Sequence, residues 1–235
     1  MTFFQRMRGF VVAGALLGSV LCAANSVEAS PIWVRDGNGG NPFNGGPGSQ
    51  IVTITVNNVN QTVLAGAFAL QYSFSDPALG ANWVDFFTYC LEPDEFLNVS
   101  ATPVTGTFAG SFGATTEYGS NATALTQLIN TWFIDSLGNS TKSAAFQIAL
   151  WEIAYDNTID LDSGNFQFGT LGAIKTQALA YLDQMNWVTG GPNVGVILRV
   201  GDQDMFVIVP EPASLALMGV GLLGLGFAAR RRWAA

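Results

Sequence analysis

The sequence predicts an α+β fold with an antiparallel, barrel-like sheet and an inserted segment of about three helices. Three observations predict this class. Short runs of β-branched and aromatic residues occupy residues 51–112, amphipathic helical patterns occupy residues 121–187, and two further strand patterns follow over residues 194–209. Because strands precede and follow the helices instead of alternating with them, the sheet is expected to be antiparallel.

The first strands are predicted from alternation and turn residues. Residues 51–56 are rich in β-branched side chains, and the Asn57-Asn58 pair indicates a turn into a second strand over residues 62–74. The short aromatic segment 84–91 is expected to be a largely buried strand that ends near Cys90.

The remaining strand patterns lie further along the chain. A strand is expected over residues 104–112, and residues 194–200 and 205–209 are expected to form a hairpin around Gly201-Asp202. Residues 30–50 contain a Gly/Asn/Pro-rich run and are expected to be a loop or linker. The folded domain is therefore predicted to span residues 51–209.

Three helices are predicted from apolar residues at helical spacing. They cover residues 121–137, residues 143–155 and residues 171–187. The apolar stripe of the first helix consists of Leu125, Leu128, Ile129, Trp132 and Phe133. The second helix has Phe146, Leu150 and Ile153 on one face, and the third has Leu171, Ile174, Ala178, Leu182 and Met185.

The N-terminal residues have the pattern of a signal peptide. Arg6 and Arg8 precede an uncharged apolar stretch over residues 9–24, and small residues before Ser30 permit cleavage after Ala29. A second candidate cleavage site follows Ala24. Residues 1–29 are therefore predicted to direct export and to be removed by signal peptidase.

The C-terminal residues 210–235 combine three parts. Pro210-Glu211-Pro212 precede the uncharged, apolar residues 213–229, and Arg230-Arg231-Arg232 follow. The apolar segment is at the short end of the length that can span a bilayer. A basic cluster beside an apolar span stays on the cytoplasmic side, so the preceding domain is expected to face outward.

These three parts in this order resemble the PEP-CTERM sorting signal of Gram-negative bacteria. The resemblance implies that an exosortase, a membrane protease-transpeptidase, recognises Pro210, Glu211, Pro212 and the arginines and removes the tail. The protein is then expected in the inner membrane transiently, through its C-terminal helix, and afterwards at the cell surface or in the extracellular matrix.

The composition of residues 30–209 excludes several classes of function. This region carries four basic residues against fifteen acidic ones, a net charge of −11, so it repels phosphate backbones and is not expected to bind nucleic acid. The chain has no histidine, which excludes Ser-His-Asp and Cys-His nucleophiles and the usual zinc sites. No cofactor is expected. Cys22 leaves with the signal peptide, so Cys90 has no intrachain disulfide partner.

Two short segments carry residue types suited to a covalent site. Residues 88–92 read Thr-Tyr-Cys-Leu-Glu and contain Cys90, and residues 145–152 read Ala-Phe-Gln-Ile-Ala-Leu-Trp-Glu and contain Gln147. A thiolate is the best nucleophile available without histidine, and a glutamine offers a carbonyl carbon if the fold holds the two within reach.

Together the two segments resemble the thioester domains of bacterial surface adhesins, which carry an aromatic-Cys-aliphatic motif and a later apolar-Gln-x-Ala-apolar-Trp helix. The matching residues are Tyr89, Cys90, Leu91, Phe146, Gln147, Ala149, Leu150 and Trp151. The resemblance implies that Cys90 and Gln147 join, with loss of ammonia, into an internal thioester that an amine or hydroxyl of a partner opens. It also implies that Tyr89, Phe146 and Trp151 form a supporting pocket that excludes water.

A structural alternative remains open. A solitary cysteine at a strand end is commonly a small buried hydrophobe, and glutamine is compatible with any helix. The protein would then be a non-catalytic structural or adhesive component of the exopolysaccharide or biofilm layer. It is not expected to be an enzyme, because no two carboxylates sit in a distinctive motif of the kind that a glycosidase pairs.

Two other acidic patterns are weaker. Asp156, Asp160 and Asp162 offer oxygen ligands of the kind that calcium takes, but they lack the spacing and the distal glutamate of an EF-hand loop, so no metal is expected. A solvated acidic turn is expected around Pro93. It comprises Glu92, Asp94 and Glu95.

Overall fold

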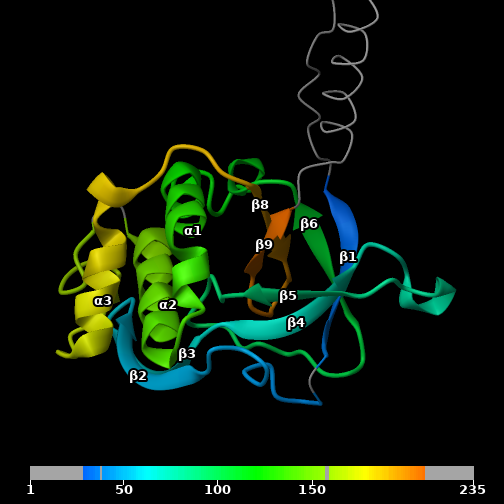
Figure 1. Ribbon diagram of the computed structural model, residues 1–235, viewed down its shortest axis with the longest axis horizontal. Coiled ribbons are helices and arrows are strands. Elements are labelled where there is room, and N and C mark those ends of the chain that lie inside the picture. Colours follow the sequence, from blue (N-terminus) through cyan, green and yellow to red (C-terminus); the bar gives the residue numbers. More distant parts are fainter. Residues whose placement is uncertain (1–28, 38, 157–158, 210–235) are drawn as a thin grey trace, which may run out of the picture.

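The computed structural model describes residues 29–37, 39–156 and 159–209, which form two antiparallel sheets and three α-helices. The strands in this part are β1 (Ser30–Asp36), β2 (Ser49–Val56), β3 (Val59–Gly66), β4 (Phe68–Ser73), β5 (Val84–Thr88), β6 (Val104–Ala109), β7 (Phe166–Gln167), β8 (Asn193–Leu198) and β9 (Met205–Val209). The helices are α1 (Ala122–Ser136), α2 (Ser140–Tyr155) and α3 (Ala173–Leu182), with short 3-10 helices η1 (Pro77–Leu79), η2 (Phe112–Ala114) and η3 (Gln184–Asn186). The predicted α+β class is confirmed, and Figure 1 shows the three α-helices gathered on one side of the larger sheet. The predicted signal peptide and sorting tail lie outside the described residues.

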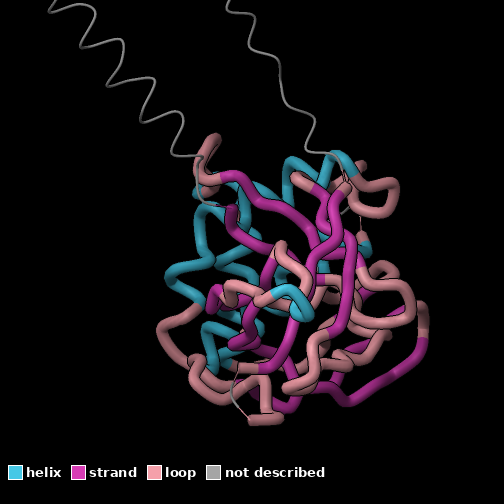
Figure 2. Tube along the Cα trace, turned by 90° about the vertical axis from the view of Figure 1, so that its right-hand side faces the viewer, coloured by secondary structure: helices cyan, strands magenta, loops and turns pink. Residues whose placement is uncertain are grey.

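The larger sheet is antiparallel throughout and almost closes into a barrel. Its strand order is β5-β4-β1-β6-β8-β9. The chain beyond β5 returns to β9, where Cys90 pairs with Met205 and the Leu91 N–H donates to the Asp204 carbonyl at 2.9 Å. Figure 2 shows the strands crossing the middle of the molecule, with most of the helical segments to their left. Closure by the segment that contains Cys90 places this residue at the junction of sheet and helices.

The prediction of a linker over residues 30–50 was wrong for its first part. Residues Ser30–Asp36 form β1, which lies inside the larger sheet between β4 and β6. Ile32 and Val34 are fully buried, and Trp33 and Arg35 alternate with them on the opposite face. The alternation is short and lies directly beside the Gly/Asn/Pro-rich run, which concealed it.

The smaller sheet has the order β3-β2-β7 and includes the predicted hairpin. Asn57 and Asn58 both have positive φ, 50° and 66°, as a two-residue hairpin turn requires. The single strand predicted over residues 62–74 is in fact two, because the chain leaves β3 at Gly66 and enters β4 of the other sheet at Phe68. Gly66, at φ +155°, stands at this change of sheet, and a Cβ there would lie 2.7 Å from the Gly48 carbonyl oxygen.

Helix α2 is the centre of the molecule. It packs against α1, α3 and the β2–β3 hairpin, and all residues from Ser143 to Ile153 are buried. Its start is fixed by Asn139, whose side chain accepts the Lys142 N–H at 3.0 Å. A helix covered on every side must bury its polar residues too, so each of them needs a partner inside the protein.

The third predicted helix is shorter than expected. Helix α3 ends at Leu182, and the side chain of Asp183 accepts the Met185 N–H and begins η3 instead. Leu171 and Met185, which were expected in the buried stripe, are 86% and 95% exposed. The apolar periodicity therefore extends past the helix at both ends.

Candidate functional site

Cys90 and Gln147, which the sequence singles out, are in direct contact in the interior. The Gln147 Oε1 accepts the backbone N–H of Cys90 at 3.1 Å, and its Nε2 donates to the Cys90 carbonyl at 2.6 Å. Cys90 is 1% exposed and Gln147 is fully buried. The side-chain carbonyl that a thiol would attack thus lies beside the residue that carries the thiol.

This contact follows from how the sheet closes. Cys90 lies opposite Met205, and the neighbouring Leu91 N–H donates to the carbonyl of Asp204, the residue before β9. In an antiparallel pair, a residue at such a non-hydrogen-bonded position directs its own N–H and C=O away from the partner strand. The two backbone groups of Cys90 therefore face α2, where Gln147 in the middle of the helix pairs with both.

The thiol itself is buried and neutral at physiological pH. It donates to the Glu92 carbonyl, with 2.9 Å between Sγ and O. Burial raises the pKa of the Cys90 thiol well above its ordinary value, because a thiolate would lose its solvation there, and the nearby carboxylates of Glu92 and Asp204 act in the same direction. A backbone hydrogen bond at Glu92 and the Trp151 side chain lower the pKa of the Cys90 thiol, each by less than burial raises it.

The predicted supporting residues surround this contact. Tyr89 is fully buried, its hydroxyl donates to Ser136 Oγ at 2.7 Å, and its ring lies 4.8 Å from that of Phe146. Burial raises the pKa of Tyr89 to about 12. The Trp151 Nε1 makes no hydrogen bond of good geometry within the described chain, although its side chain is close enough to the Cys90 thiol to lower the pKa of that group. We therefore interpret the indole N–H as lying near the sulfur without a formed hydrogen bond.

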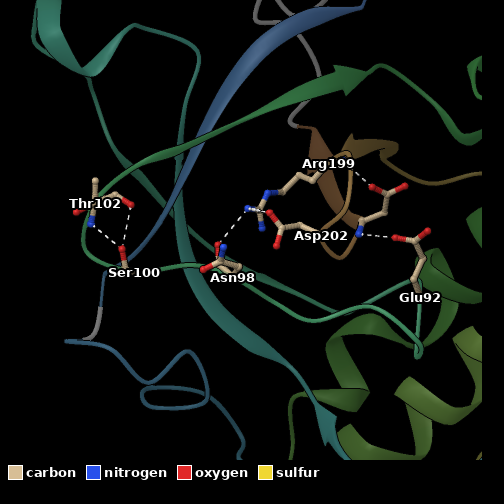
Figure 3. A network of polar contacts seen from close by, with 7 residues as sticks. Glu92, Asn98, Ser100, Thr102, Arg199 and Asp202 are labelled. Carbon is tan, nitrogen blue, oxygen red and sulfur yellow. Dashed lines mark hydrogen bonds and ion pairs between the residues drawn. The ribbon is translucent and has the colours of Figure 1, made fainter.

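An acidic hollow of about 260 Å³ adjoins the site on the side of Glu92. It is lined by Asn57, Glu92, Glu117, Tyr118, Ala154, Tyr155 and Asn165. Glu92 follows Cys90 by two residues, and its Oε2 accepts the Asp204 N–H at 2.9 Å, a contact drawn in Figure 3. The prediction that Glu92 belongs to a solvated turn was therefore wrong, because this side chain turns inward toward the β8–β9 loop.

Glu92 at this hollow and the neighbouring Asp204 hold their protons more tightly than ordinary carboxyl groups. Burial, followed by the negative charges of Asp204 and Glu117, raises the pKa of Glu92 to about 8. Burial also raises the pKa of Asp204 to about 6, and Asp204 accepts a hydrogen bond from the Tyr118 hydroxyl at 3.2 Å. Carboxylate oxygens of Glu92, Glu117 and Asp204 come within 4.8 Å of one another, which makes them the metal-capable group among the described residues. Sequence reasoning missed this group because its members are far apart in the chain.

The three calcium candidates do not gather into such a group within the described chain. The two Asp156 carboxylate oxygens accept the backbone N–H groups of Asn165 and Phe166, each at 2.8 Å. Asp160 accepts the Asp162 N–H, and Asp162 forms an ion pair with Lys175. Each carboxylate thus has a partner within the protein.

Comparison with known families identifies the C-terminal end of the chain. Residues 209–232 match the PEP-CTERM protein-sorting motif. The chain carries a PEP-CTERM sorting signal. It is therefore an exported protein that an exosortase processes and sorts to the cell surface, as the sequence predicted. The match includes Pro210-Glu211-Pro212 and the three arginines and covers about a tenth of the chain.

No curated protein and no solved structure matches the chain. Within the described residues, no helix has the length and apolar character needed to cross a membrane, and the apolar segment 213–229 falls outside them.

Proposed function

We propose that this PEP-CTERM protein attaches covalently to a partner at the cell surface through an internal thioester between Cys90 and Gln147. The observation that carries the proposal is the pair of hydrogen bonds by which the Gln147 amide is held against the Cys90 backbone. The attachment happens once per molecule, so the domain is a covalent binding module and not an enzyme.

Formation of the thioester requires only groups that the chain supplies. The Cys90 sulfur attacks the Gln147 side-chain carbon, the C–N bond breaks, and the departing nitrogen takes the thiol proton and leaves as ammonia. A fixed position for the amide beside the Cys90 backbone supports this step, since an intramolecular reaction between positioned groups gains a large effective molarity. The raised pKa of the thiol acts against it, because little thiolate is present.

The same burial supports the persistence of a thioester once it exists. Opening the bond expels Cys90 as a thiolate, and a thiolate is poorly solvated where the residue is 1% exposed. Tyr89, Phe146 and Trp151 keep water from the carbonyl carbon. The electrophile is thereby protected until a partner nucleophile enters.

The acidic hollow supports an amine as that nucleophile. An amine of the partner attacks the Gln147 carbonyl carbon, the C–S bond breaks, an amide forms, and the amine proton passes to the Cys90 sulfur. The carboxylate of Glu117 attracts an ammonium group to the hollow, and Glu92, with a pKa of about 8, can exchange a proton near neutral pH. A hydroxyl group of the partner can attack the same carbon, but the acidic lining gives a neutral hydroxyl no electrostatic advantage.

One observation favours the second candidate function, a non-catalytic structural or adhesive role. The Gln147 amide completes the hydrogen bonding of a sheet end that would otherwise be unpaired, and this suffices as a structural reason for a buried glutamine. Both candidates agree on export and surface location.

Uptake of methylamine distinguishes the two. The exported protein is purified, incubated with isotopically labelled methylamine, and compared with the Cys90→Ala variant. The thioester proposal expects label on residue 147 and the appearance of one free thiol in the wild-type protein, and neither in the variant. Absence of label in the wild-type protein, or equal label in both, leaves the structural role as the function.

A further inference from the structure

A second hollow lies against the outer face of the larger sheet and shares no lining residue with the acidic hollow beside Cys90. Its volume is about 540 Å³. It is lined by Trp33, Asp76, Pro77, Ala78, Pro103, Val104, Thr105, Arg199 and Asp202. The lining thus combines an indole ring and two prolines with carboxylates and a guanidinium, and neither export nor the thioester uses any of these residues.

Trp33 is presented outward by the alternation of β1. Its neighbours Ile32 and Val34 are fully buried on the inner face, while Trp33 lies on the outer face opposite Ser73 of β4 and Thr105 of β6. A tryptophan in the middle of a central strand, partly exposed beside a hollow, offers a flat apolar surface with a polar edge.

Arg199 supplies unsatisfied donors at the wall of this hollow. It is 6% exposed, and its Nη2 donates to the Asn98 carbonyl at 3.1 Å and to Asp202 Oδ2 at 2.8 Å, as Figure 3 shows. Its Nε and Nη1 have no hydrogen-bond acceptor within the described chain. Buried N–H groups are almost always paired, and because both atoms expose less than 1 Å², a ligand oxygen in the hollow pairs with them once the Arg199 side chain shifts toward it.

The outer face continues beyond the hollow with similar groups. Arg35, two residues after Trp33, donates to Gln71 Oε1 at 2.7 Å, and Gln71 donates to Asp85 Oδ1 at 2.8 Å. The Arg35 guanidinium also stacks over Trp83, 4.1 Å from its ring centroid. A row of planar polar side chains beside a second tryptophan suits a ligand longer than one unit.

We propose that the hollow at Trp33 binds a neutral pyranose unit of a polysaccharide. The apolar C–H face of the sugar packs on the Trp33 ring, its hydroxyls donate to the carboxylates of Asp76 and Asp202, and a hydroxyl oxygen accepts from Arg199. A sugar acid is disfavoured because two carboxylates line the hollow and residues 30–209 carry a net charge of −11. This binding is non-covalent and does not depend on the thioester.

Affinity electrophoresis of the exported protein tests the proposal. Gels contain dextran, laminarin or galactomannan as neutral polysaccharides, or polygalacturonate as the acidic one. We expect at least one neutral polysaccharide to retard the protein and polygalacturonate to leave it unretarded. Retardation by none of the neutral polymers, or stronger retardation by polygalacturonate, overturns the proposal.

Two variants and a control locate the site. Trp33→Ala is expected to weaken binding roughly tenfold or more, because an aromatic anchor is lost. Asp76→Asn keeps an acceptor for the Ala78 N–H, so η1 is retained, and it is also expected to weaken binding. Trp187→Phe changes a tryptophan outside this hollow and is expected to bind like the wild-type protein. Unchanged binding by both test variants places the polysaccharide elsewhere and refutes the assignment.

Discussion

Replacing Gln147 by leucine measures what the buried amide contributes to the fold. The Cys90→Ala background removes any thioester while keeping the backbone groups that Gln147 pairs with. Leucine leaves the N–H and C=O of residue 90 without partners, at a cost of about 1–3 kcal/mol each, and its apolar burial returns about 1 kcal/mol. We therefore expect a loss of about 3 kcal/mol, a large share of the roughly 5–15 kcal/mol by which domains are stable.

Gln147→Glu in the same background is the matched control. A protonated carboxyl can accept the N–H and donate to the C=O of residue 90, whereas an ionised one cannot donate. Burial raises the pKa of such a carboxyl, so the stability of this variant should approach that of its parent at pH 5 and fall as the pH rises to 8. Urea unfolding at both pH values gives the free energies. A leucine variant within about 0.5 kcal/mol of its parent, the range of an ordinary surface substitution, would refute the hydrogen-bonding argument.

Three further predictions concern groups around the site. Burial, followed by the charges of Asp156 and Asp160, raises the pKa of Glu152 from 4.5 to about 7, so the folded protein keeps a proton that the unfolded chain loses, and its stability falls as the pH rises from 4.5 to 7. In urea unfolding, Glu152→Gln should therefore match the wild-type protein at pH 4 and be more stable by about 2 kcal/mol at pH 8. Equal unfolding curves for the two proteins at pH 8 would contradict this prediction. In the Gln147→Leu variant, which cannot form a thioester, the Cys90 thiol should react with a water-soluble maleimide only as fast as the domain opens, and immediate labelling in native buffer would show that the thiol is accessible. If the thioester forms, Glu117→Gln should slow its reaction with cationic cadaverine more than with neutral hydroxylamine, and an equal change for both would remove the carboxylates from acceptor selection.

The sequence predicted those elements that short-range patterns specify by themselves. The β-branched run at residues 51–56, the Asn57-Asn58 turn and the helical spacing in α1 and α2 each contain their own information, and the structure has these elements close to the expected bounds. Strand β1 was missed because its short alternation gains its burial from β4 and β6, which are distant in the chain. The change of sheet between Gly66 and Phe68 was hidden for the same reason, since both halves of the segment are strand-like.

The site was predictable in part. The residue types at positions 90 and 147 were visible in the sequence, and so was the aromatic character of their neighbours. The contact itself depends on the closure of the sheet at Met205, which turns the Cys90 backbone toward α2. The inward turn of Glu92 depends on Asp204, more than a hundred positions later, so sequence spacing carried no sign of the acidic hollow.

The most direct test of the central claim is a peptide map of the exported protein. Trypsin cleavage after Lys142 separates Cys90, in residues 36–142, from Gln147, in residues 143–175. If the thioester exists, digestion in mildly acidic, non-reducing buffer yields these two peptides joined, lighter than their sum by one ammonia, and Cys90→Ala yields them apart. Two separate peptides from the wild-type protein, with a free thiol at Cys90 and an intact amide at Gln147, would contradict covalent attachment.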